Sequence, residues 1–193
     1  VGRLTARKGV VPFIENCFVE LAEEFPRLDY LVVGEEPAEA MFHETGYRCR
    51  IKECVVDHGL EDRVHVRGWE PAEKLVSLYQ HCEAVVFPVL PVEGDVEGFG
   101  MVAIEAGAAN SPTVGFRTGG VEDAIHHNET GILVQPADYA AMTRALRRLL
   151  TGRHQIRCIS EKIERDYDWD NVTPLYRAAL PRADRYSSRA QEP

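Results

Sequence analysis

The amino-acid sequence predicts an α/β protein built on a doubly wound parallel sheet. Short apolar runs, typical of strands, alternate along the chain with longer segments whose apolar residues recur at helical spacing. No hairpin turn joins two of these runs, so consecutive strands are expected to be connected through helices and to lie parallel. Ligands bind such sheets at the carboxyl ends of the strands. The loops after Leu4, Val66 and Phe87 are therefore expected to converge on one edge.

The strands are expected where apolar, β-branched residues cluster. Val1–Leu4 is typical of the last part of a buried strand, and we therefore expect the chain to be a fragment or an excised domain. Leu28–Gly34 is apolar on both faces toward its end, as parallel strands are. The other strands are expected within 61–68 and at 84–88, 112–116 and 130–134.

The helices are expected where apolar residues form one stripe. Val10–Ala22 has a wide stripe and tolerates Pro12 in its first turn. Asp138 can cap a helix that runs through Leu150. Helical sequence is also found at 47–57, 71–81, 101–109, 121–127, 155–167 and 170–179. Residues 35–46 can hold a short helix, and the polar tail 181–193 is expected to be disordered.

Composition narrows the class of function. The length of 193 residues fits one domain with a sizeable core, and no apolar run approaches the 18 residues of a membrane span. A net charge of −9 argues against nucleic-acid binding, which needs a basic face, but it does not exclude a small anionic ligand. Five cysteines without a C-x2-C pair favour a reducing cytoplasm.

The most informative stretch runs from Glu97 to Glu105. Glu97 is followed at once by a Gly-Phe-Gly turn, and Glu105 lies inside the apolar helix that begins at Met101. Gly98 and Gly100 allow the backbone to approach a ligand closely, and the first amides of a helix attract phosphate. Eight helical residues span about 12 Å, roughly the reach of a nucleotide-diphosphate sugar. Each acid can therefore meet one end of such a ligand.

This nonapeptide resembles the E-x7-E signature of family 4 retaining glycosyltransferases (glycosyl transferases group 1), which have the GT-B fold. The resemblance implies a Rossmann-like C-terminal half of that fold, with residues 1–180 as the nucleotide-sugar-binding domain and the N-terminal acceptor domain outside this chain. Supporting segments follow in the family's order: Val1–Leu4 with Lys8–Gly9, Gly59–Val64 with Gly68, Tyr79 to Pro88, Gly119–Glu122, Asn128–Val134, and Trp169.

The activity that the resemblance implies is transfer of a sugar from a nucleotide-diphosphate sugar to an acceptor, with retention of configuration. The enzyme would be of the hexosyltransferase type and would require neither a metal nor another cofactor. Because the acceptor domain supplies part of the reaction centre, this chain alone is expected to bind the donor weakly and to transfer nothing.

The family's site roles carry over by position. Glu97 would touch hydroxyls of the donor sugar, and Arg3 and Lys8 would contact the diphosphate and stabilise it as it departs. Glu105 would accept hydrogen bonds from the ribose. The remaining donor-binding positions are Gly98, Phe99, Gly100 and Met101 at the turn, and Val66, Arg67 and Gly68 near the base.

Three positions depart from the usual family pattern. Glu35-Glu36-Pro37 stands where the family often has Gly-x-Gly-Pro, so two acids lie near the donor cleft. Asn110 replaces a glycine but tolerates the left-handed conformation that ends a helix. Gly107 lies inside a helix, where its small size can admit a close neighbour.

Other interpretations compete with these assignments. Arg3 and Lys8 could be solvated loop charges, and Arg7 is expected to face solvent. His126-His127 lacks a third ligand at a useful spacing for a metal. A basic helical face is expected to be solvated, with contact to an anionic membrane as the alternative: Arg144, Arg147, Arg148, Arg153 and Arg157. The alternative function is a non-catalytic module of GT-B type that binds a nucleotide sugar.

Overall fold

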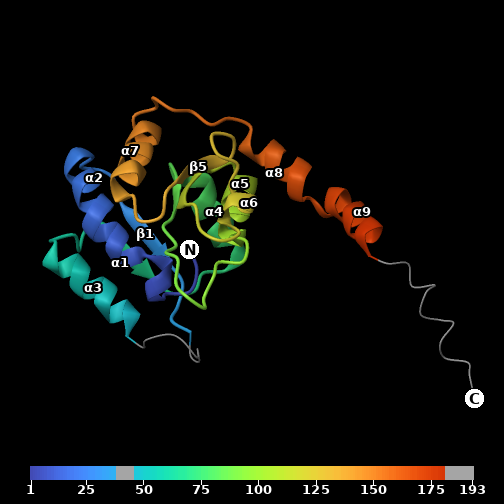
Figure 1. Cartoon of the computed structure of the whole chain (residues 1–193). Coiled ribbons are helices and arrows are strands. Elements are labelled where there is room, and N and C mark those ends of the chain that lie inside the picture. The colour runs from blue at the N-terminus through green and yellow to red at the C-terminus, as the bar shows by residue number, and fades with distance from the viewer. Residues whose placement is uncertain (38–45, 181–193) are drawn as a thin grey trace, which may run out of the picture.

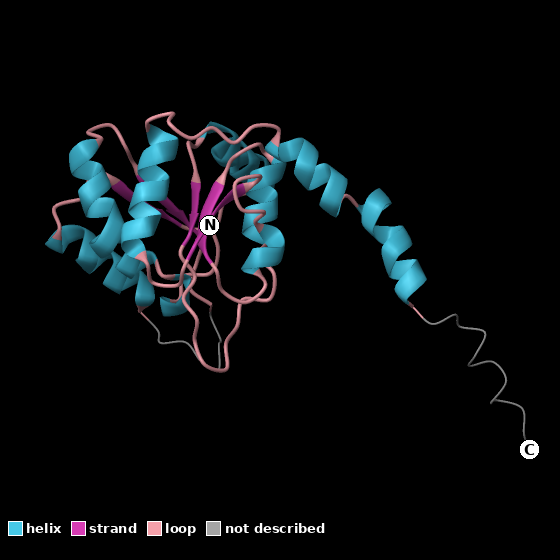
Figure 2. Cartoon of the chain, turned by 45° about the horizontal axis from the view of Figure 1, so that its top comes forward, coloured by secondary structure: helices cyan, strands magenta, loops and turns pink. Residues whose placement is uncertain are grey.

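The computed structural model describes residues 1–37 and 46–180, in which helices cover both faces of a layer of parallel strands (Figure 1; Figure 2). The strands are β1 (Tyr30–Val33), β2 (Val64–Arg67), β3 (Val85–Phe87), β4 (Thr113–Phe116) and β5 (Gly131–Val134). All the pairs that these strands form are parallel, which confirms the predicted fold class. The helix expected before Gly46 and the expected disorder of the tail concern residues outside the described ranges.

The strand layer has two hydrogen-bonded parts, β1–β2 and β3–β4–β5. The segment before Thr5 extends the first part, because Gly2 N–H donates to the Val33 carbonyl and Leu4 N–H donates to that of Glu35, both at 2.9 Å. An apolar cavity of about 150 Å³ lies between the two parts and is lined by residues of β1, β3 and their flanking helices. The extended segment delivers the turn after Leu4 to the carboxyl ends of β1 and β3.

The helices follow the predicted order with small differences in their bounds. Asp138 caps α7 as expected, since its carboxylate accepts the Ala141 amide at 2.8 Å. The helices are η1 (Ala6–Lys8), α1 (Val10–Phe13), η2 (Ile14–Phe18), α2 (Val19–Glu24), α3 (Tyr47–Asp57), α4 (Ala72–His81), α5 (Met101–Ala108), α6 (Val121–Ala124), α7 (Tyr139–Leu150), α8 (Ile159–Tyr167) and α9 (Trp169–Ala179).

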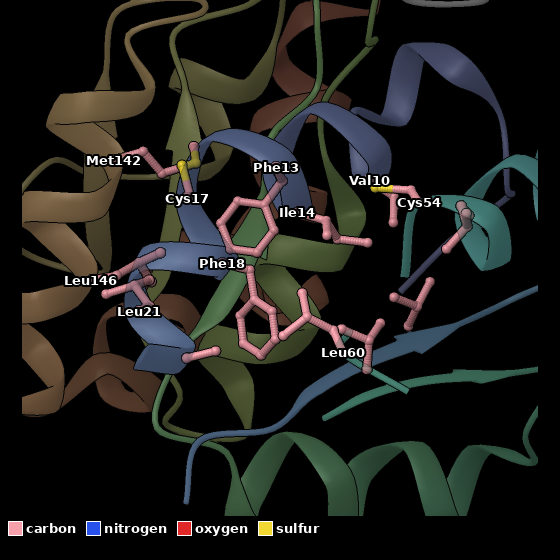
Figure 3. Packing of buried hydrophobic residues seen from close by; sticks show 14 of the residues in the cluster. Val10, Phe13, Ile14, Cys17, Phe18, Leu21, Cys54, Leu60, Met142 and Leu146 are labelled. Atoms are coloured by element: carbon pink, nitrogen blue, oxygen red, sulfur yellow. The ribbon is translucent and has the colours of Figure 1, made fainter. Parts of the chain in front are cut away.

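The long helix expected from Val10 contains a π turn. The amide of Val19 bonds the carbonyl of Ile14, five residues earlier, so η2 holds one residue more than a regular turn. Figure 3 shows Phe13, Ile14, Cys17 and Phe18 in one core, with Cys17 beside Met142 of α7. The ring centroids of Phe13 and Phe18 also lie 4.9 Å and 5.4 Å, respectively, from the ring centroid of Tyr30 on β1.

Arg147, one of the five arginines of the expected basic face, forms ion pairs with another helix of the fold. Its guanidinium contacts Glu20 and Glu24 of the first helical stretch, both at 2.6 Å. At the other end of the molecule, α9 extends away from the strand layer (Figure 1), and none of its residues is buried. No helix in the described ranges is long and apolar enough to cross a membrane.

Gly107 and Asn110 together fix α8 against α5. Asn110 has the expected left-handed φ of 65°, and its side-chain oxygen accepts the Ile159 amide at 3.1 Å, at the start of α8. A Cβ at residue 107 would lie 2.7 Å from Cγ1 of Ile163. The close neighbour expected at Gly107 is therefore α8, which spans the outer side of the helix that follows the Gly-Phe-Gly turn.

We expect Gly107→Ala to lower the free energy of unfolding by about 1–2 kcal/mol, because the added methyl group overpacks the contact with α8. Helix propensity alone predicts the opposite, an increase of about 1 kcal/mol in the free energy of unfolding, because alanine favours a helix over glycine. Urea denaturation of both proteins measures the change. In an Ile163→Ala background the clash is absent and Gly107→Ala should be neutral or stabilising, so an equal penalty in both backgrounds would contradict the packing argument.

Candidate functional site

Four charged side chains meet where the turn after Leu4 faces the loop between β3 and α5. Lys8 Nζ and Arg7 Nη1 both donate to Oε2 of Glu97, each at 2.7 Å. Arg7 Nε lies 2.9 Å from Oδ2 of Asp95, which is an ion-pair distance, although its N–H group does not have hydrogen-bond geometry toward that oxygen. The Arg7 side chain is only 6% exposed and those of Lys8 and Glu97 are 15% exposed. We call Arg7, Lys8, Asp95 and Glu97 the charge cluster.

The expectation that Arg7 faces solvent was wrong. Its guanidinium is buried because two carboxylates about 90 residues away in the chain are folded onto it. Nothing in the local sequence Thr5–Gly9 distinguishes Arg7 from Arg3, which is exposed and forms no ion pair within the described ranges. Arg3 does line a small cavity of about 30 Å³ together with Lys8.

Backbone contacts hold the turn onto the end of β3. Gly9 has a left-handed φ of 70°, and a Cβ there would lie 2.0 Å from the carbonyl oxygen of Pro88. The Leu90 amide donates to the Arg7 carbonyl at 2.9 Å. The loops after Leu4 and Phe87 therefore meet at one edge, as expected, and bring Arg7 and Lys8 to Glu97.

Two opposing effects act on the pKa of the Glu97 carboxyl. Burial raises this pKa, but hydrogen bonds from Lys8 and Arg7, together with their positive charges, bring it below its usual value. Glu97 is therefore a carboxylate at neutral pH. The ammonium of Lys8 also lies 5.2 Å from the centre of the Phe87 ring, so it is held from two sides.

The Gly-Phe-Gly turn lies beside the charge cluster and is partly open to solvent. Gly98 is exposed, and a Cβ there would meet no protein atom within 4 Å. Gly100 has a left-handed φ of 92° and precedes α5, whose N-terminus carries no side-chain cap. Met101, the first residue of α5, is 58% exposed. Solvent can therefore reach the start of this helix.

Two neighbouring segments support the turn from behind. The Gly120 amide donates to the Glu97 carbonyl at 2.9 Å, and a Cβ at Gly120 would lie 2.0 Å from the Gly98 oxygen. The Phe99 ring packs edge-on against Tyr167 of α8 at 5.7 Å. The Gly-Gly pair at 119–120 is thus a support for the turn, which its sequence spacing alone did not reveal.

Glu105 is exposed on α5 and hydrogen-bonded to a buried tyrosine of α4. The Tyr79 hydroxyl donates to Glu105 Oε2 at 3.0 Å. Burial first, and the charge of Glu105 second, raise the pKa of Tyr79, so its hydroxyl keeps its proton. The amino group of Val1 is within electrostatic range of both Lys8 and Glu105: burial first, and the charge of Lys8 second, lower its pKa to about 6 against the opposing effect of Glu105. Lys8 and Glu105 therefore both lie in the neighbourhood of Val1.

The predicted base-binding residues lie at the end of β2. Gly68 accepts a hydrogen bond from the Gly34 amide at 3.1 Å, which joins the loops after β1 and β2. Glu35, one of the two unusual acids, accepts the Trp69 amide at 3.4 Å, while Arg67 is exposed beside Glu70. Glu36 accepts the Arg48 amide at 2.7 Å. Both acids therefore have structural partners, although they replace glycines of the usual pattern.

The structure thus gathers Lys8, Glu97 and residues 98–101 in one place, and it adds Arg7 and Asp95, which sequence reasoning did not assign to the site. Asp95 lies two residues before Glu97, but an acid in a polar loop carries no signal of its partner. Within the described ranges no group of three or more His, Cys, Asp or Glu side chains could hold a metal ion.

Three comparisons with known proteins identify the family and the fold of the chain. The sequence pattern of the family described as glycosyl transferases group 1 matches residues 1–165. The chain is 39% identical over 153 residues to a D-inositol 3-phosphate glycosyltransferase from Corynebacterium diphtheriae, covering 78% of this chain and 33% of that protein. It spans less than half the length of the curated relatives it matches.

Solved structures show the same fold. Sucrose-phosphate synthase from Thermosynechococcus elongatus superposes with a TM-score of 0.73 and 29% identity, over 93% of this chain and 44% of that chain. The C-terminal domain of a glycosyl transferase group 1 family protein (LpcC) from Francisella tularensis superposes with a TM-score of 0.66 and 24% identity, over 91% of this chain and 83% of that domain.

Proposed function

We propose that this chain, which belongs to the glycosyl transferases group 1 family, binds the nucleotide-diphosphate sugar of a retaining, hexosyltransferase-type enzyme. The chain aligns with the C-terminal half of GT-B glycosyltransferases. The observation that carries the proposal is the position of the charge cluster beside an accessible glycine turn and the uncapped start of α5. Lys8 of the cluster, Arg3 on the same segment and a helix N-terminus suit a diphosphate, and the Glu97 carboxylate suits sugar hydroxyls.

The proposed roles follow the order of groups along the site. Lys8 and Arg3 contact the diphosphate, and the amides of residues 99–101 face the phosphate and sugar. Glu97 accepts hydrogen bonds from hydroxyls of the donor sugar. As negative charge builds on the departing diphosphate, Lys8, Arg3 and the start of α5 stabilise it.

The nucleoside end of the donor lies toward α4 and β2 in this proposal. Glu105 accepts hydrogen bonds from the ribose hydroxyls through the oxygen that Tyr79 does not bind. The end of β2, with Val66, Arg67 and the following Gly68, adjoins the base. These residues occupy the carboxyl ends of parallel strands or the helices that follow them, where ligands of such sheets bind.

Residues 1–180 are proposed to form the donor-binding domain, with acceptor recognition supplied by a further domain. The exposed apolar side chains on and directly after α9 support this, since large exposed apolar residues are suited to packing against a partner: Trp169, Leu175, Tyr176 and Leu180, each 62% or more exposed. Activity of the complete enzyme therefore depends on a part that this chain does not hold.

We expect Glu105→Ala to weaken nucleoside diphosphate binding about 10- to 100-fold, because two charge-assisted hydrogen bonds to the ribose are lost. Titration calorimetry with UDP, GDP and ADP, free and linked to a sugar, measures the change. Glu53→Ala, which removes an exposed carboxylate from α3 on a different helix, is the matched control and should leave binding unchanged. Equal affinities of the wild type and Glu105→Ala for every nucleotide would contradict the proposed ribose contact.

A further inference from the structure

In the charge cluster, two cationic side chains contact the same oxygen of Glu97. Lys8 Nζ and Arg7 Nη1 both lie 2.7 Å from Oε2. Under the proposed function, Lys8 also has to reach the diphosphate of the donor. A single compact ammonium group cannot form close ion pairs with the carboxylate and the diphosphate at the same time, so Glu97 and the diphosphate compete for Lys8.

We propose that Arg7 is the permanent counter-ion of Glu97 and that Lys8 is an exchangeable one, which passes from Glu97 Oε2 to the diphosphate when the donor binds. Arg7, anchored by Asp95, then keeps Glu97 ionised and in place to meet the sugar. Arg7 is in this sense a positioning residue. This inference rests on the proposed function and deepens it.

The two cations differ in how firmly they are held. Arg7 is 6% exposed, pairs with Asp95 as well as Glu97, and has its carbonyl bonded by the Leu90 amide. Lys8 is more exposed, at 15%, and its long flexible side chain ends on one carboxylate oxygen beside the Phe87 ring. Moving Arg7 would leave the Asp95 carboxylate without its cation and Glu97 with Lys8 alone, whereas moving Lys8 leaves both carboxylates paired with Arg7.

The exchange predicts effects that simple charge repulsion does not. Glu97→Gln should tighten binding of a nucleoside diphosphate that carries no sugar, because Lys8 is released. Asp95→Asn removes the same charge from the same cluster, but Asp95 touches Arg7 and not Lys8. It should therefore not tighten binding. If the carboxylates only repelled the diphosphate from a distance, both variants would tighten it alike.

A double-mutant cycle adds a second, independent criterion. Arg7→Met should weaken nucleoside diphosphate binding, because Glu97 then depends on Lys8 alone and holds it more tightly. In the Glu97→Gln background this effect should disappear, since no carboxylate remains to retain Lys8. A direct contact between Arg7 and phosphate would instead give the same loss in both backgrounds.

The test is calorimetric titration of the 193-residue chain and its variants with UDP, GDP and ADP, up to millimolar nucleotide. We expect about three- to tenfold tighter binding for Glu97→Gln, a change below about twofold for Asp95→Asn, about tenfold weaker binding for Arg7→Met, and a loss below about twofold when Arg7→Met is made in the Glu97→Gln background. Circular dichroism reports whether Arg7→Met folds; if it does not, the comparison of Glu97→Gln with Asp95→Asn decides.

Equal tightening by Glu97→Gln and Asp95→Asn, or weaker binding by Glu97→Gln, would overturn the exchange while leaving donor binding intact. Additive effects of Arg7→Met and Glu97→Gln on the free energy of nucleotide binding would also overturn the exchange. If the wild-type chain binds none of the three nucleotides, the proposed function itself fails, and the exchange fails with it.

Discussion

Gly120→Ala is expected to lower the free energy of unfolding by about 3 kcal/mol and to abolish detectable nucleotide binding. The added Cβ would lie 2.0 Å from the carbonyl oxygen of Gly98 and 3.0 Å from Cα of Phe99. Both are backbone atoms, so no side chain can move aside and the Gly-Phe-Gly turn itself has to shift. Gly120 has an ordinary φ of −76°, so the penalty is steric and not conformational. Urea denaturation and calorimetry measure the two effects.

Gly98→Ala is the matched control, because it adds the same methyl group to the other side of the same contact. A Cβ at Gly98 meets no protein atom within 4 Å, so the free energy of unfolding should change by less than about 0.5 kcal/mol. Because the turn is proposed to face the donor and Gly98 is exposed there, donor binding should still weaken. Equal stabilities of the Gly98→Ala and Gly120→Ala proteins would contradict the packing of the two loops.

Arg7→Met is expected to lower the free energy of unfolding by about 3 kcal/mol at neutral pH. The substitution keeps much of the side-chain volume but removes a buried charge that pairs with Asp95 and Glu97. Breaking a buried ion pair costs about 3–5 kcal/mol, and the 28% exposure of Asp95 places this case at the lower end. Arg3→Met, four residues away and exposed, should change the stability by less than about 0.5 kcal/mol. Comparable losses for the two variants would contradict the assignment of Arg7 to the charge cluster.

The Arg7→Met penalty should also depend on pH. Burial raises the pKa of Glu97, but hydrogen bonds from Lys8 and Arg7 bring it below the ordinary value of 4.5. A carboxyl whose pKa is depressed by folding stabilises the protein above its unfolded pKa, and that contribution is lost as the pH falls through the folded value. The difference in stability between wild type and Arg7→Met should therefore be largest at neutral pH and shrink below pH 4.5. Urea denaturation at a series of pH values measures it, and a constant difference would contradict the ion pairing.

The sequence predicted much of the candidate site because its key signals are local. The spacing of Glu97 and Glu105, the two glycines of the turn and the helix that follows all lie within nine residues. Lys8 was assigned through the resemblance, and the structure places it 2.7 Å from Glu97. The assignment of Arg7 to solvent failed because burial of an arginine depends on its partners, and both partners come from a loop about 90 residues away.

Local sequence patterns predicted the order and type of the elements, the family and the glycine turn between two acids, because apolar periodicity, glycines and caps act over a few neighbouring residues. The packing of distant segments brings Arg7 and Asp95 to Lys8 and Glu97, places Gly120 against the turn and sets α8 against Gly107. These features depend on distances between segments far apart in the chain. Such distances are set by how the layers pack, and a single sequence records no trace of them at the residues concerned.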